Sequence, residues 1–342
     1  MHASAPRAPL WLRFLSGPDI EELGITSGEI IEAVEGVVAA HGRGETVFEP
    51  RVHLVPDNGG AGHFNVLRGH VSSLGDHGVS GVKVVGDFHP NYRLGLPSEL
   101  ALLTLYDPAT GVPQAVIDAT FVTEARTGAM TAVGARHLAR PGSRILGHAG
   151  ARGTAFSNVT MLDSLFDLDE IRVTSRRPES REEFARRLAE HTDTPVRVTG
   201  SVAEAFDGAD ILVEATRLTE PAPLLHPGLV GAGAFVVPYG TVSAVSHDLL
   251  DAVDKVVVDD WREARSGRFG ALRHHVDTGR LSADTLHAEL GDILTGRRPG
   301  REDERERILL WHRGLSILDV AVGHLVLERA RSADAGTLLR YR

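Results

Sequence analysis

Cysteine is absent from the 342-residue sequence, which excludes disulfides, thiolate metal sites and a cysteine nucleophile. No apolar run approaches the ~20 residues needed to span a bilayer. The N-terminal stretch MHASAPRAPLWLRFL lacks the apolar core of a signal peptide. The formal net charge is −10, whereas nucleic-acid-binding proteins are more often basic. These features predict a cytoplasmic protein that binds neither membranes nor nucleic acids.

Lysine is scarce: the chain has 36 basic side chains, and only Lys83 and Lys255 among them are lysines. A buried lysine can lose its proton, whereas an arginine stays protonated. A lysine retained in so arginine-rich a chain is therefore a candidate for chemistry that arginine cannot perform. Retention by chance is the alternative.

Length and hydrophobic pattern predict two domains. Residues 20–41 have helical spacing, and short strand-like segments follow at 47–55, 78–88, 101–107 and 113–122. These segments predict an antiparallel or mixed sheet. Helical spacing returns at 123–139 and again, around a charged stretch, at 281–335.

Between these helical regions, strand-like and helical segments alternate. Strands are expected at 143–148, 170–176, 195–200, 209–216, 234–240 and 255–260, with helices at 154–166 and 180–192. Such alternation is typical of a parallel, doubly wound sheet covered by helices. The sequence therefore predicts an α/β fold with a Rossmann-type domain and a second α+β domain.

The segment RILGHAGARGTAF joins the first of these strands to a helix and is rich in glycine. Glycines at a strand–helix turn let the backbone approach a pyrophosphate at the positive end of the helix. His148 stands where a strict GxGxxG pattern has its first glycine. The cofactor-binding candidates are His148, Gly150, Ala151, Arg152 and Gly153. An ordinary strand–helix turn is the alternative.

The next predicted strand indicates which dinucleotide would bind. An NAD site usually has an acid at this strand's tip to accept from the ribose 2′-hydroxyl. Here the strand ends in Ser175, Arg176 and Arg177. Arginine binds phosphate in two-pronged fashion, so these residues favour a 2′-phosphate and hence NADP over NAD. Two solvated arginines are the alternative.

Beyond these patterns, the sequence resembles the ornithine cyclodeaminase/mu-crystallin family over nearly its whole length. The resemblance is strongest in GVKVVGDFHPNYRLGLPSELALLTLYDPATGVPQAVIDATFVTEARTGA and continues in ADILVEATRLTEP, AELGDILTGRRPG and GLSILDVAVGHLVLERA. It implies a homodimer of two-domain subunits with NAD(P)-linked imine chemistry on amino or imino acids. The implied domains are 131–309 for the dinucleotide and 1–130 plus 310–342 for substrate binding and dimerisation.

Site residues follow from the same resemblance. The family's carboxylate-binding basic residues correspond to Arg51 in EPRVHL, Lys83 in GVKVVG and Arg126 in TEARTGA. Arginine can grip a substrate carboxylate, and Lys83 can bind it or assist proton transfer at the imine nitrogen. Lys83 and Arg126 are thus the catalytic candidates. Thr127 and Thr216 correspond to positions that face the cofactor.

Two acids of the family's cyclodeaminases are replaced in this chain. Asn65 stands in the place of one of them and remains a substrate-binding candidate, and Val242 in Gly240-Thr241-Val242 stands in the place of the other. Valine can neither transfer a proton nor bind a distal ammonium, although Asp248 lies nearby. Tyr239 and His247 are possible donors in the same loop.

The chain is therefore predicted to be an NAD(P)-dependent oxidoreductase that reduces an imino acid or reversibly oxidises a small amino acid. An ammonia-releasing cyclodeaminase and a non-catalytic NADPH-binding protein are the alternatives. No metal site is predicted, because zinc usually needs three or four converging ligands and no such motif occurs.

Overall fold

The computed structural model describes residues 9–342 except 58, 241 and 268, so residues 1–8 of the N-terminal stretch and Thr241 lie outside it. The described chain divides into two compact units. Unit 1 contains the chain through Thr26, Glu45–Thr123 and Ser316–Arg342, and unit 2 contains Ser27–Gly44 and Glu124–Leu315. The sequence-based division differs from these units chiefly at 27–44, which it assigns to the first domain.

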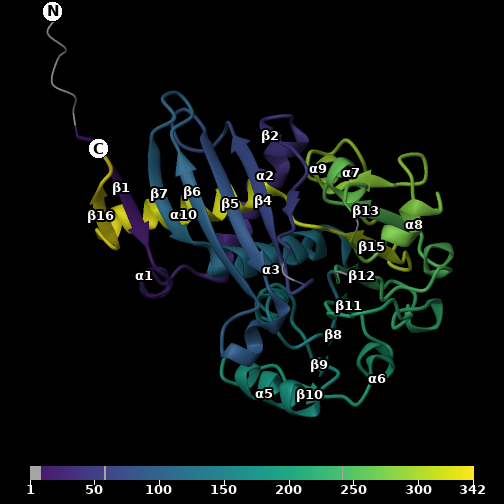
Figure 1. Cartoon of the computed structure of the whole chain (residues 1–342). Helices are drawn as coiled ribbons and strands as arrows, with labels where there is room; N and C mark the ends of the chain where they lie inside the picture. Colours follow the sequence, from purple (N-terminus) through teal and green to yellow (C-terminus); the bar gives the residue numbers. More distant parts are fainter. Residues whose placement is uncertain (1–8, 58, 241, 268) are drawn as a thin grey trace, which may run out of the picture. The chain divides into compact units, whose positions relative to one another are not determined.

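Unit 1 is a mixed sheet with one long helix packed on a single face (Figure 1). Its elements are β1 (Trp11–Leu15), α1 (Gly17–Glu22), β2 (Thr46–Phe48), β3 (Val52–Leu54), β4 (His63–Val71), β5 (Val79–Asp87), η1 (His89–Leu94), β6 (Glu99–Tyr106), β7 (Pro113–Asp118), α10 (Ser316–Ala333) and β16 (Thr337–Arg340). The strand order is β16-β1-β7-β6-β5-β4-β2, and β3 also pairs with β4. All neighbours are antiparallel except β1 and β7. The expected mixed sheet is confirmed.

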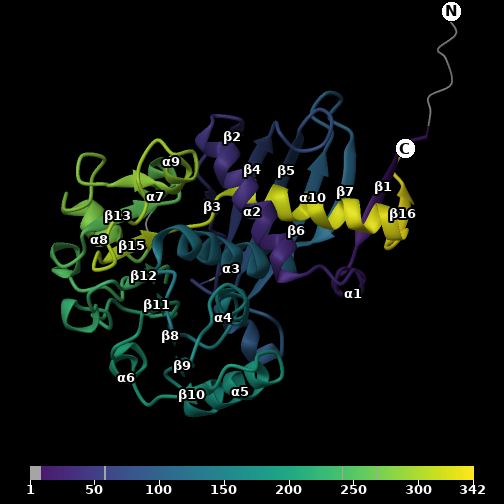
Figure 2. The same cartoon turned by 180° about the vertical axis from the view of Figure 1, so that it is seen from behind.

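Side chains alternate across this sheet, as a strand with one covered face requires. On β5, Val79, Gly81, Lys83 and Val85 are buried, whereas Val84 is exposed. A side chain at Gly81 would come within 2.9 Å of Val320 on α10. The buried face is therefore the one that α10 covers, as Figure 2 shows from behind.

Unit 2 is an eight-stranded sheet in which every pairing is parallel. Its elements are α2 (Ser27–Gly42), α3 (Ala119–Leu138, whose first turn is assigned to unit 1), β8 (Ile145–Ala149), α4 (Ala155–Asp163), β9 (Glu170–Thr174), α5 (Pro178–Ala189), β10 (Val196–Val198), α6 (Val202–Phe206), β11 (Ile211–Glu214), η2 (Pro227–Leu229), β12 (Phe235–Pro238), η3 (Leu249–Asp251), β13 (Lys255–Val258), α7 (Trp261–Ala264), α8 (Arg273–Asp277), β14 (Ala288–Glu289), α9 (Leu290–Leu294) and β15 (Ile308–Trp311).

The strand order of unit 2 is β10-β9-β8-β11-β12-β15-β13-β14. Its first five strands follow the 3-2-1-4-5 part of the order of dinucleotide-binding sheets, so the chain reverses direction across the sheet between β8 and β11. The sixth place is taken by β15, the last strand of the unit in the chain, which lies between β12 and β13. Ligands of such sheets bind outside the carboxyl ends of the strands at this switch point. The predicted doubly wound fold is confirmed, and the Gly-rich turn after β8 lies at the switch point.

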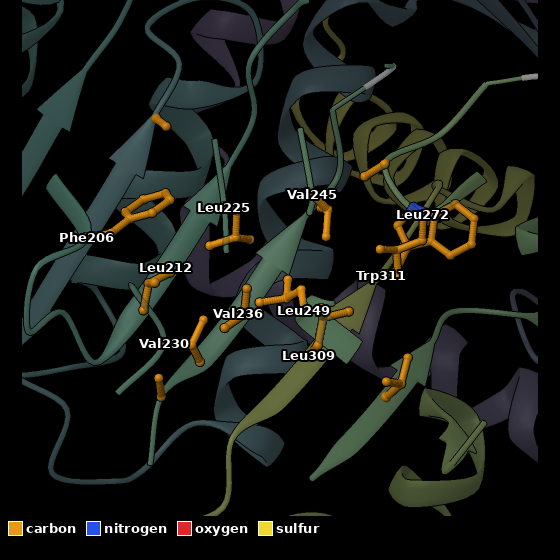
Figure 3. Close-up of a cluster of buried hydrophobic side chains, with 14 of the residues drawn as sticks. Phe206, Leu212, Leu225, Val230, Val236, Val245, Leu249, Leu272, Leu309 and Trp311 are labelled. Atoms are coloured by element: carbon orange, nitrogen blue, oxygen red, sulfur yellow. The ribbon is translucent and has the colours of Figure 1, made fainter. Parts of the chain in front are cut away.

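One face of the unit 2 sheet carries a large apolar core (Figure 3). Leu212, Val236 and Leu309 come from the adjacent strands β11, β12 and β15, and Leu272 and Trp311 pack in the same cluster. All five are at most 1% exposed. Strands buried in this way read as continuous apolar runs, which is why β11 and β12 were recognisable in the sequence.

Three local expectations are wrong. The segment 308–311 lies in the region expected to be helical, but it forms β15 between β12 and β13. Residues 119–122, expected at the end of a strand, form the first turn of α3. The helical pattern at 20–41 corresponds to two helices, α1 and α2.

Candidate functional site

The turn after β8 is built around two glycines in left-handed or related conformations. Gly150 has φ +119°, and a side chain there would stand 2.7 Å from the Ala215 carbonyl oxygen, so only glycine fits without strain. The Gly150 N–H donates to the Thr174 carbonyl at 2.9 Å, which ties the turn to the end of β9. Gly153 has φ +56° and leads into α4. The predicted Gly150–Gly153 loop thus lies at the N-terminus of a helix.

His148 supports this loop from inside the protein. Its ring is fully buried, and Nδ1 lies 2.9 Å from the Gly150 carbonyl oxygen, to which it can donate. Burial lowers the pKa of His148 to about 4, so the ring is neutral at physiological pH. His148 thus supports the turn from within, and a direct contact with the cofactor stays a prediction.

Basic side chains gather where β8 and β9 end. Arg176 and Arg177 are exposed immediately after β9, and the half-buried Ser175 hydroxyl donates to the Arg177 carbonyl at 3.0 Å. Arg152 reaches across from the glycine loop, with Nη2 3.3 Å from Ser180 Oγ near the start of α5. The glycine turn, the N-terminus of α4 and these arginines together present hydrogen-bond donors and positive charge that suit the phosphates of a dinucleotide.

The end of β11 carries a buried acid, Glu214, that is not among the residues predicted from the sequence. Glu214 is 0% exposed, and its Oε1 accepts from the Thr216 N–H at 2.8 Å and from the Thr216 hydroxyl. Burial raises the pKa of Glu214 to about 7, against the opposing effect of these hydrogen bonds. An acid closing the otherwise apolar run ILVE was the sequence signal for it.

Tyr239, which follows β12, is held by its hydroxyl and by its ring. The hydroxyl shares a 2.6 Å hydrogen bond with Thr154 at the start of α4 and accepts from Asn158 Nδ2. The ring stacks on His312 at 5.1 Å and 27°. His312 Nε2 lies 3.0 Å from Thr131 Oγ1, and burial, with Arg126 nearby, lowers the pKa of His312 to about 3. His312 is not among the residues predicted from the sequence.

The loop after β12 also contains Val242, which stands where the family resemblance predicts an acid in cyclodeaminases, and the nearby Asp248. Val242 is half-buried, and Thr241 lies outside the described residues. Asp248 is exposed, and its Oδ1 accepts from the Ser246 hydroxyl at 2.6 Å. Its surroundings therefore resemble a surface turn more than a proton-transfer site.

Arg126, on α3, packs against the backbone at Gly314, in the loop that follows β15. It is 7% exposed, and a side chain at Gly314 would fall 1.7 Å from its Nη1 atom. Asp259 holds this loop by accepting from the N–H groups of Arg313 and Gly314, both at 2.8 Å. Thr127, the next candidate on α3, is 6% exposed. Asp259 thus fixes the backbone at Gly314, and this backbone in turn limits where the guanidinium of Arg126 can lie.

Lys83 is the centre of a polar group inside unit 1. Its Nζ donates to Asp319 Oδ1 on α10 at 2.5 Å and to Thr123 Oγ1 at 3.0 Å. The Lys83 and Asp319 side chains are each 1% exposed. A buried ammonium of this kind needs such a partner, because an uncompensated charge is strongly destabilised inside a protein.

The sheet of unit 1 places the other substrate-binding candidates on the same face. Leu67 pairs with Lys83, and Asn65 pairs with Val85, so Asn65 and Lys83 lie on one face in adjacent rows. Arg51 precedes Val52, whose partner is Val66, so continuing this register brings Arg51 level with Leu67. Within unit 1, the structure therefore groups Arg51, Asn65 and Lys83.

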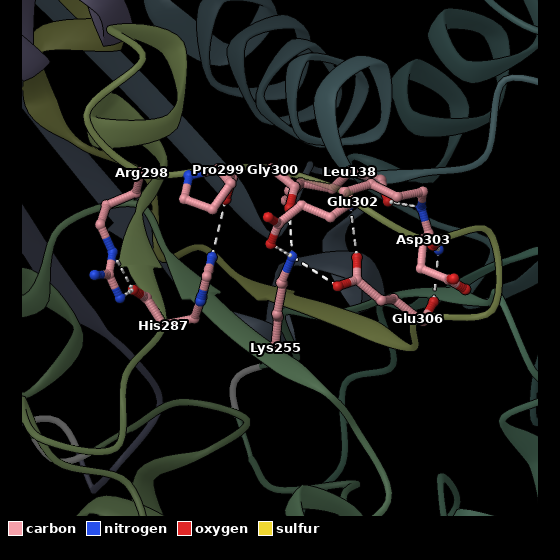
Figure 4. Close-up of polar contacts among 10 residues, drawn as sticks. Leu138, Lys255, His287, Arg298, Pro299, Gly300, Glu302, Asp303 and Glu306 are labelled. Atoms are coloured by element: carbon pink, nitrogen blue, oxygen red, sulfur yellow. Dashed lines mark hydrogen bonds and ion pairs between the residues drawn. The ribbon is translucent and has the colours of Figure 1, made fainter.

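Lys255, the second lysine, has a structural environment (Figure 4). Its Nζ donates to the Gly300 carbonyl at 2.7 Å and forms ion pairs with Glu302 at 2.8 Å and Glu306 at 2.7 Å. These contacts tie β13 to the charged stretch before β15. Of the two lysines, only Lys83 is therefore a candidate for chemistry.

Three side chains in unit 2, His41, Asp260 and Glu289, bring potential metal-ligating atoms within 4.8 Å of one another. The hydrogen bonds of the two carboxylates explain their positions without a metal ion. Asp260 caps α7 by accepting from the Glu263 N–H at 3.0 Å, and its other oxygen accepts from Arg262 at 3.2 Å. Glu289 accepts from the Trp261 N–H at 2.9 Å. The group anchors the first turn of α7.

Among the described residues, no helix is both long enough and apolar enough to cross a membrane.

Comparison with known proteins decides the family. The model of the ornithine cyclodeaminase/mu-crystallin family matches residues 13–334. The chain belongs to this family. The resemblance predicted from the sequence motifs is thereby confirmed.

Members of the ornithine cyclodeaminase/mu-crystallin family similar to this chain include enzymes of amino-acid and imino-acid chemistry. Alanine dehydrogenase of Archaeoglobus fulgidus is 29% identical over 330 residues, covering 96% of this chain and 98% of its own length. The structure of Thermococcus litoralis Δ1-pyrroline-2-carboxylate reductase with NADH and L-proline has a TM-score of 0.88 at 28% identity, covering 95% and 99%. An archaeal alanine dehydrogenase dimer with bound NAD has a TM-score of 0.88 at 27% identity, covering 97% and 100%.

Proposed function

We propose that this protein is an NAD(P)-dependent oxidoreductase that reduces an imino acid or reversibly oxidises a small amino acid. The observation that carries the proposal is the Gly150 turn at the switch point of a dinucleotide-type sheet, in a chain whose other unit buries Lys83 among polar partners. The alanine dehydrogenase and pyrroline-2-carboxylate reductase relatives support this reaction class.

In this proposal the loop Gly150–Gly153 and the N-terminus of α4 hold the cofactor's phosphates, and Thr127 and Thr216 lie on its nicotinamide side. The bound nicotinamide supplies or accepts the hydride. Arg126 binds the substrate carboxylate as a two-pronged donor. Lys83 binds the carboxylate or holds a proton at Nζ for the imine nitrogen, with Asp319 and Thr123 fixing its position. Arg51 and Asn65 complete the substrate contacts on the unit 1 sheet.

We infer that NADP is preferred over NAD. Ser175, Arg176 and Arg177 follow β9 where an NAD site usually has an acid, and Arg152 extends toward the same region. A 2′-phosphate would meet several guanidinium donors there. The relatives solved with NAD or NADH make NAD the competing cofactor, so the two must be compared directly.

A homodimer is supported by the uncovered face of the unit 1 sheet. Val52, Val66, Val84 and Leu102 form one row across β3 to β6 on the side opposite Lys83. Val52, Val84 and Leu102 are 51%, 41% and 52% exposed. A contiguous exposed apolar row of this kind marks an interaction surface, and a second copy of the chain is the proposed occupant. A cytoplasmic location stays a prediction.

The alternative of a cyclodeaminase is less well supported. Asn65 and Val242 stand where that activity would use acids, and neither can take up a proton from a substrate amine. A non-catalytic NADPH-binding protein would keep the Gly150 turn but show no turnover. Both alternatives are separated from the proposal by one set of assays.

The deciding experiment measures NADPH and NADH oxidation with 2-oxo acids plus ammonia or methylamine, and with preformed cyclic imines such as Δ1-pyrroline-2-carboxylate. Turnover with any of these substrates supports imine reduction. Cofactor binding with no turnover and no ammonia release from ornithine or lysine favours a non-catalytic role. Ammonia release without imine reduction favours the cyclodeaminase.

A further inference from the structure

Glu214 occupies the switch point of the unit 2 sheet. It is the last residue of β11 and pairs in register with Ala149, the last residue of β8. The backbone beside it is tied to both neighbouring strands, because Ala215 N–H donates to Ala149 at 2.8 Å and Tyr239 N–H donates to the Glu214 carbonyl at 3.0 Å. A carboxyl group here lies at the edge where a sheet of this order binds its ligand.

The two carboxyl oxygens of Glu214 have different surroundings. Oε1 accepts from both the N–H (2.8 Å) and the hydroxyl of Thr216, so it fixes the backbone and side chain of that residue together. Oε2 is buried and accepts no hydrogen bond from a side chain among the described residues, and its neighbour is the backbone of Gly240, whose N–H lowers the pKa of the carboxyl group. A Cβ atom at position 240 would stand 2.9 Å from Oε2, so a residue larger than glycine would crowd this oxygen.

Charge near Glu214 is low. Burial is the main effect on its pKa, raising it to about 7, and no charged side chain among the described residues contributes. The titratable or charged residues on neighbouring elements are His148 on β8, Tyr239 after β12 and Arg217 after Thr216. His148 stays neutral, since burial lowers its pKa to about 4. The Glu214 carboxyl is therefore the group here that changes charge near neutral pH.

Dinucleotide-binding sheets consist of two mononucleotide-binding halves. The half formed by β8, β9 and β10 carries the glycine turn and the arginines that suit the adenosine side. Glu214 and Thr216 belong to the other half, which starts at β11 and serves the nicotinamide side. An ionised carboxylate at this edge would repel the phosphates of an incoming cofactor, whereas a neutral carboxyl would not.

We propose that Glu214 is a positioning residue for the nicotinamide half of the cofactor, holding Thr216 in place and taking up a proton from solvent as the anionic cofactor binds. The inference rests on the proposed function. It requires that cofactor affinity fall as Glu214 ionises. It also requires that loss of the Glu214 carboxyl weaken binding of the nicotinamide half of the cofactor and not of the adenosine half.

The test is a fluorescence titration of NADPH and NADH at pH 6.0 to 8.5 with wild type, Glu214→Gln and Glu214→Ala. Adenosine 2′,5′-bisphosphate serves as a probe of the adenosine half. NADH is included because it lacks the 2′-phosphate of NADPH, which itself titrates with a pKa of about 6. A pH dependence seen with NADH therefore cannot come from that phosphate. Glu190→Gln, at an exposed position after α5, is the matched control for loss of one acidic charge.

We expect the wild-type Kd for NADH to rise several-fold above about pH 7, and Glu214→Gln to abolish this dependence while binding tightly. Glu214→Ala should weaken NADPH about tenfold, the equivalent of one or two lost hydrogen bonds, and leave the bisphosphate unchanged. The inference is overturned if Glu214→Gln keeps the wild-type pH dependence, or if Glu214→Ala binds NADPH within twofold of wild type. Wild type that binds neither NADPH nor NADH would instead overturn the proposed function.

Thermal unfolding of each variant shows whether weak cofactor binding is caused by loss of folding. The Gln variant keeps an oxygen that can accept from Thr216, so it should melt close to wild type and remain informative even where the Ala variant is unstable.

Discussion

The ammonium of Lys83 on β5 lies 2.5 Å from Oδ1 of Asp319 on α10, and both side chains are 1% exposed. The two residues are 236 positions apart in the chain. A buried pair of this kind stabilises the fold little compared with apolar residues of the same shape, yet breaking it is strongly destabilising. Retaining such a pair is therefore better explained by a role for the lysine in chemistry than by stability.

Replacing Lys83 by Met is expected to abolish turnover and to lower the free energy of unfolding by about 3–5 kcal/mol, because the Asp319 carboxylate stays buried without its lysine. Denaturant unfolding and the substrate-panel assay measure the two effects. A single variant cannot separate them, since an unfolded enzyme is also inactive.

The double variant Lys83→Met/Asp319→Leu provides the control. Removing both charges should restore most of the lost stability while turnover stays absent and NADPH still binds. If the double variant regained wild-type turnover, Lys83 would have no direct part in the reaction.

The sequence located Lys83 because lysine is scarce and this one lies in an apolar strand. It gave no indication of Asp319 as the partner, since that contact depends on how α10 packs on the sheet. Glu214 and His312 were missed for a related reason: a single polar residue in or beside an apolar run shows its burial only when the neighbouring strands are known. Their shifted pKa values come from desolvation, which no spacing motif reports.

The fold class was predictable because parallel strands buried on both faces read as apolar runs between helical segments. The wrong assignments arose where periodicity carries little information. The run ILLW in β15 is only four residues long and fully buried, so its pattern fits a helix or a strand equally well. Much of α3 is buried around its whole circumference, so its beginning at Ala119 had no polar face to mark it.

The exposed row on the unit 1 sheet leads to a prediction about assembly. Leu102→Lys places a charge in the middle of the apolar row and is expected to convert a dimer into monomers, which light scattering after size exclusion would detect. Val198→Lys is the matched control, because Val198 is also exposed (38%) on a strand but lies on β10 in unit 2. An unchanged dimer mass for Leu102→Lys would place the interface elsewhere.

Acid should destabilise the protein through its buried histidines. Burial lowers the pKa of His148 from 6.5 to about 4, so the folded state resists protonation that the unfolded chain accepts. Its contribution to stability is thus present above about pH 6.5 and is lost as the pH falls toward 4. At pH 5 the loss amounts to about 2 kcal/mol, since each pKa unit is worth about 1.4 kcal/mol.

His148→Asn tests this directly, because the amide can still donate toward the Gly150 carbonyl but does not titrate. Urea unfolding at pH 7.5 and pH 5 should show a smaller pH-dependent loss in this variant than in wild type, by about 2 kcal/mol. An equal loss in the two proteins would assign the acid sensitivity to other groups, such as His312.

Cofactor selection is expected to depend on the arginines after β9. Arg176→Ala/Arg177→Ala should weaken NADPH binding by at least about tenfold, because loss of even one hydrogen bond to a charged phosphate costs about 1.5–3 kcal/mol. NADH has no 2′-phosphate, so its Kd should change by less than about threefold, which is within the range of screened long-range charge effects.

Arg297→Ala/Arg298→Ala removes another adjacent, exposed arginine pair of unit 2 and should affect the binding of neither cofactor. Raising the salt concentration should narrow the difference between NADPH and NADH in wild type and leave the double variant nearly unchanged. Equal weakening of NADPH and NADH in Arg176→Ala/Arg177→Ala would show that these arginines act on the pyrophosphate or on the fold, and that the 2′-phosphate is not their ligand.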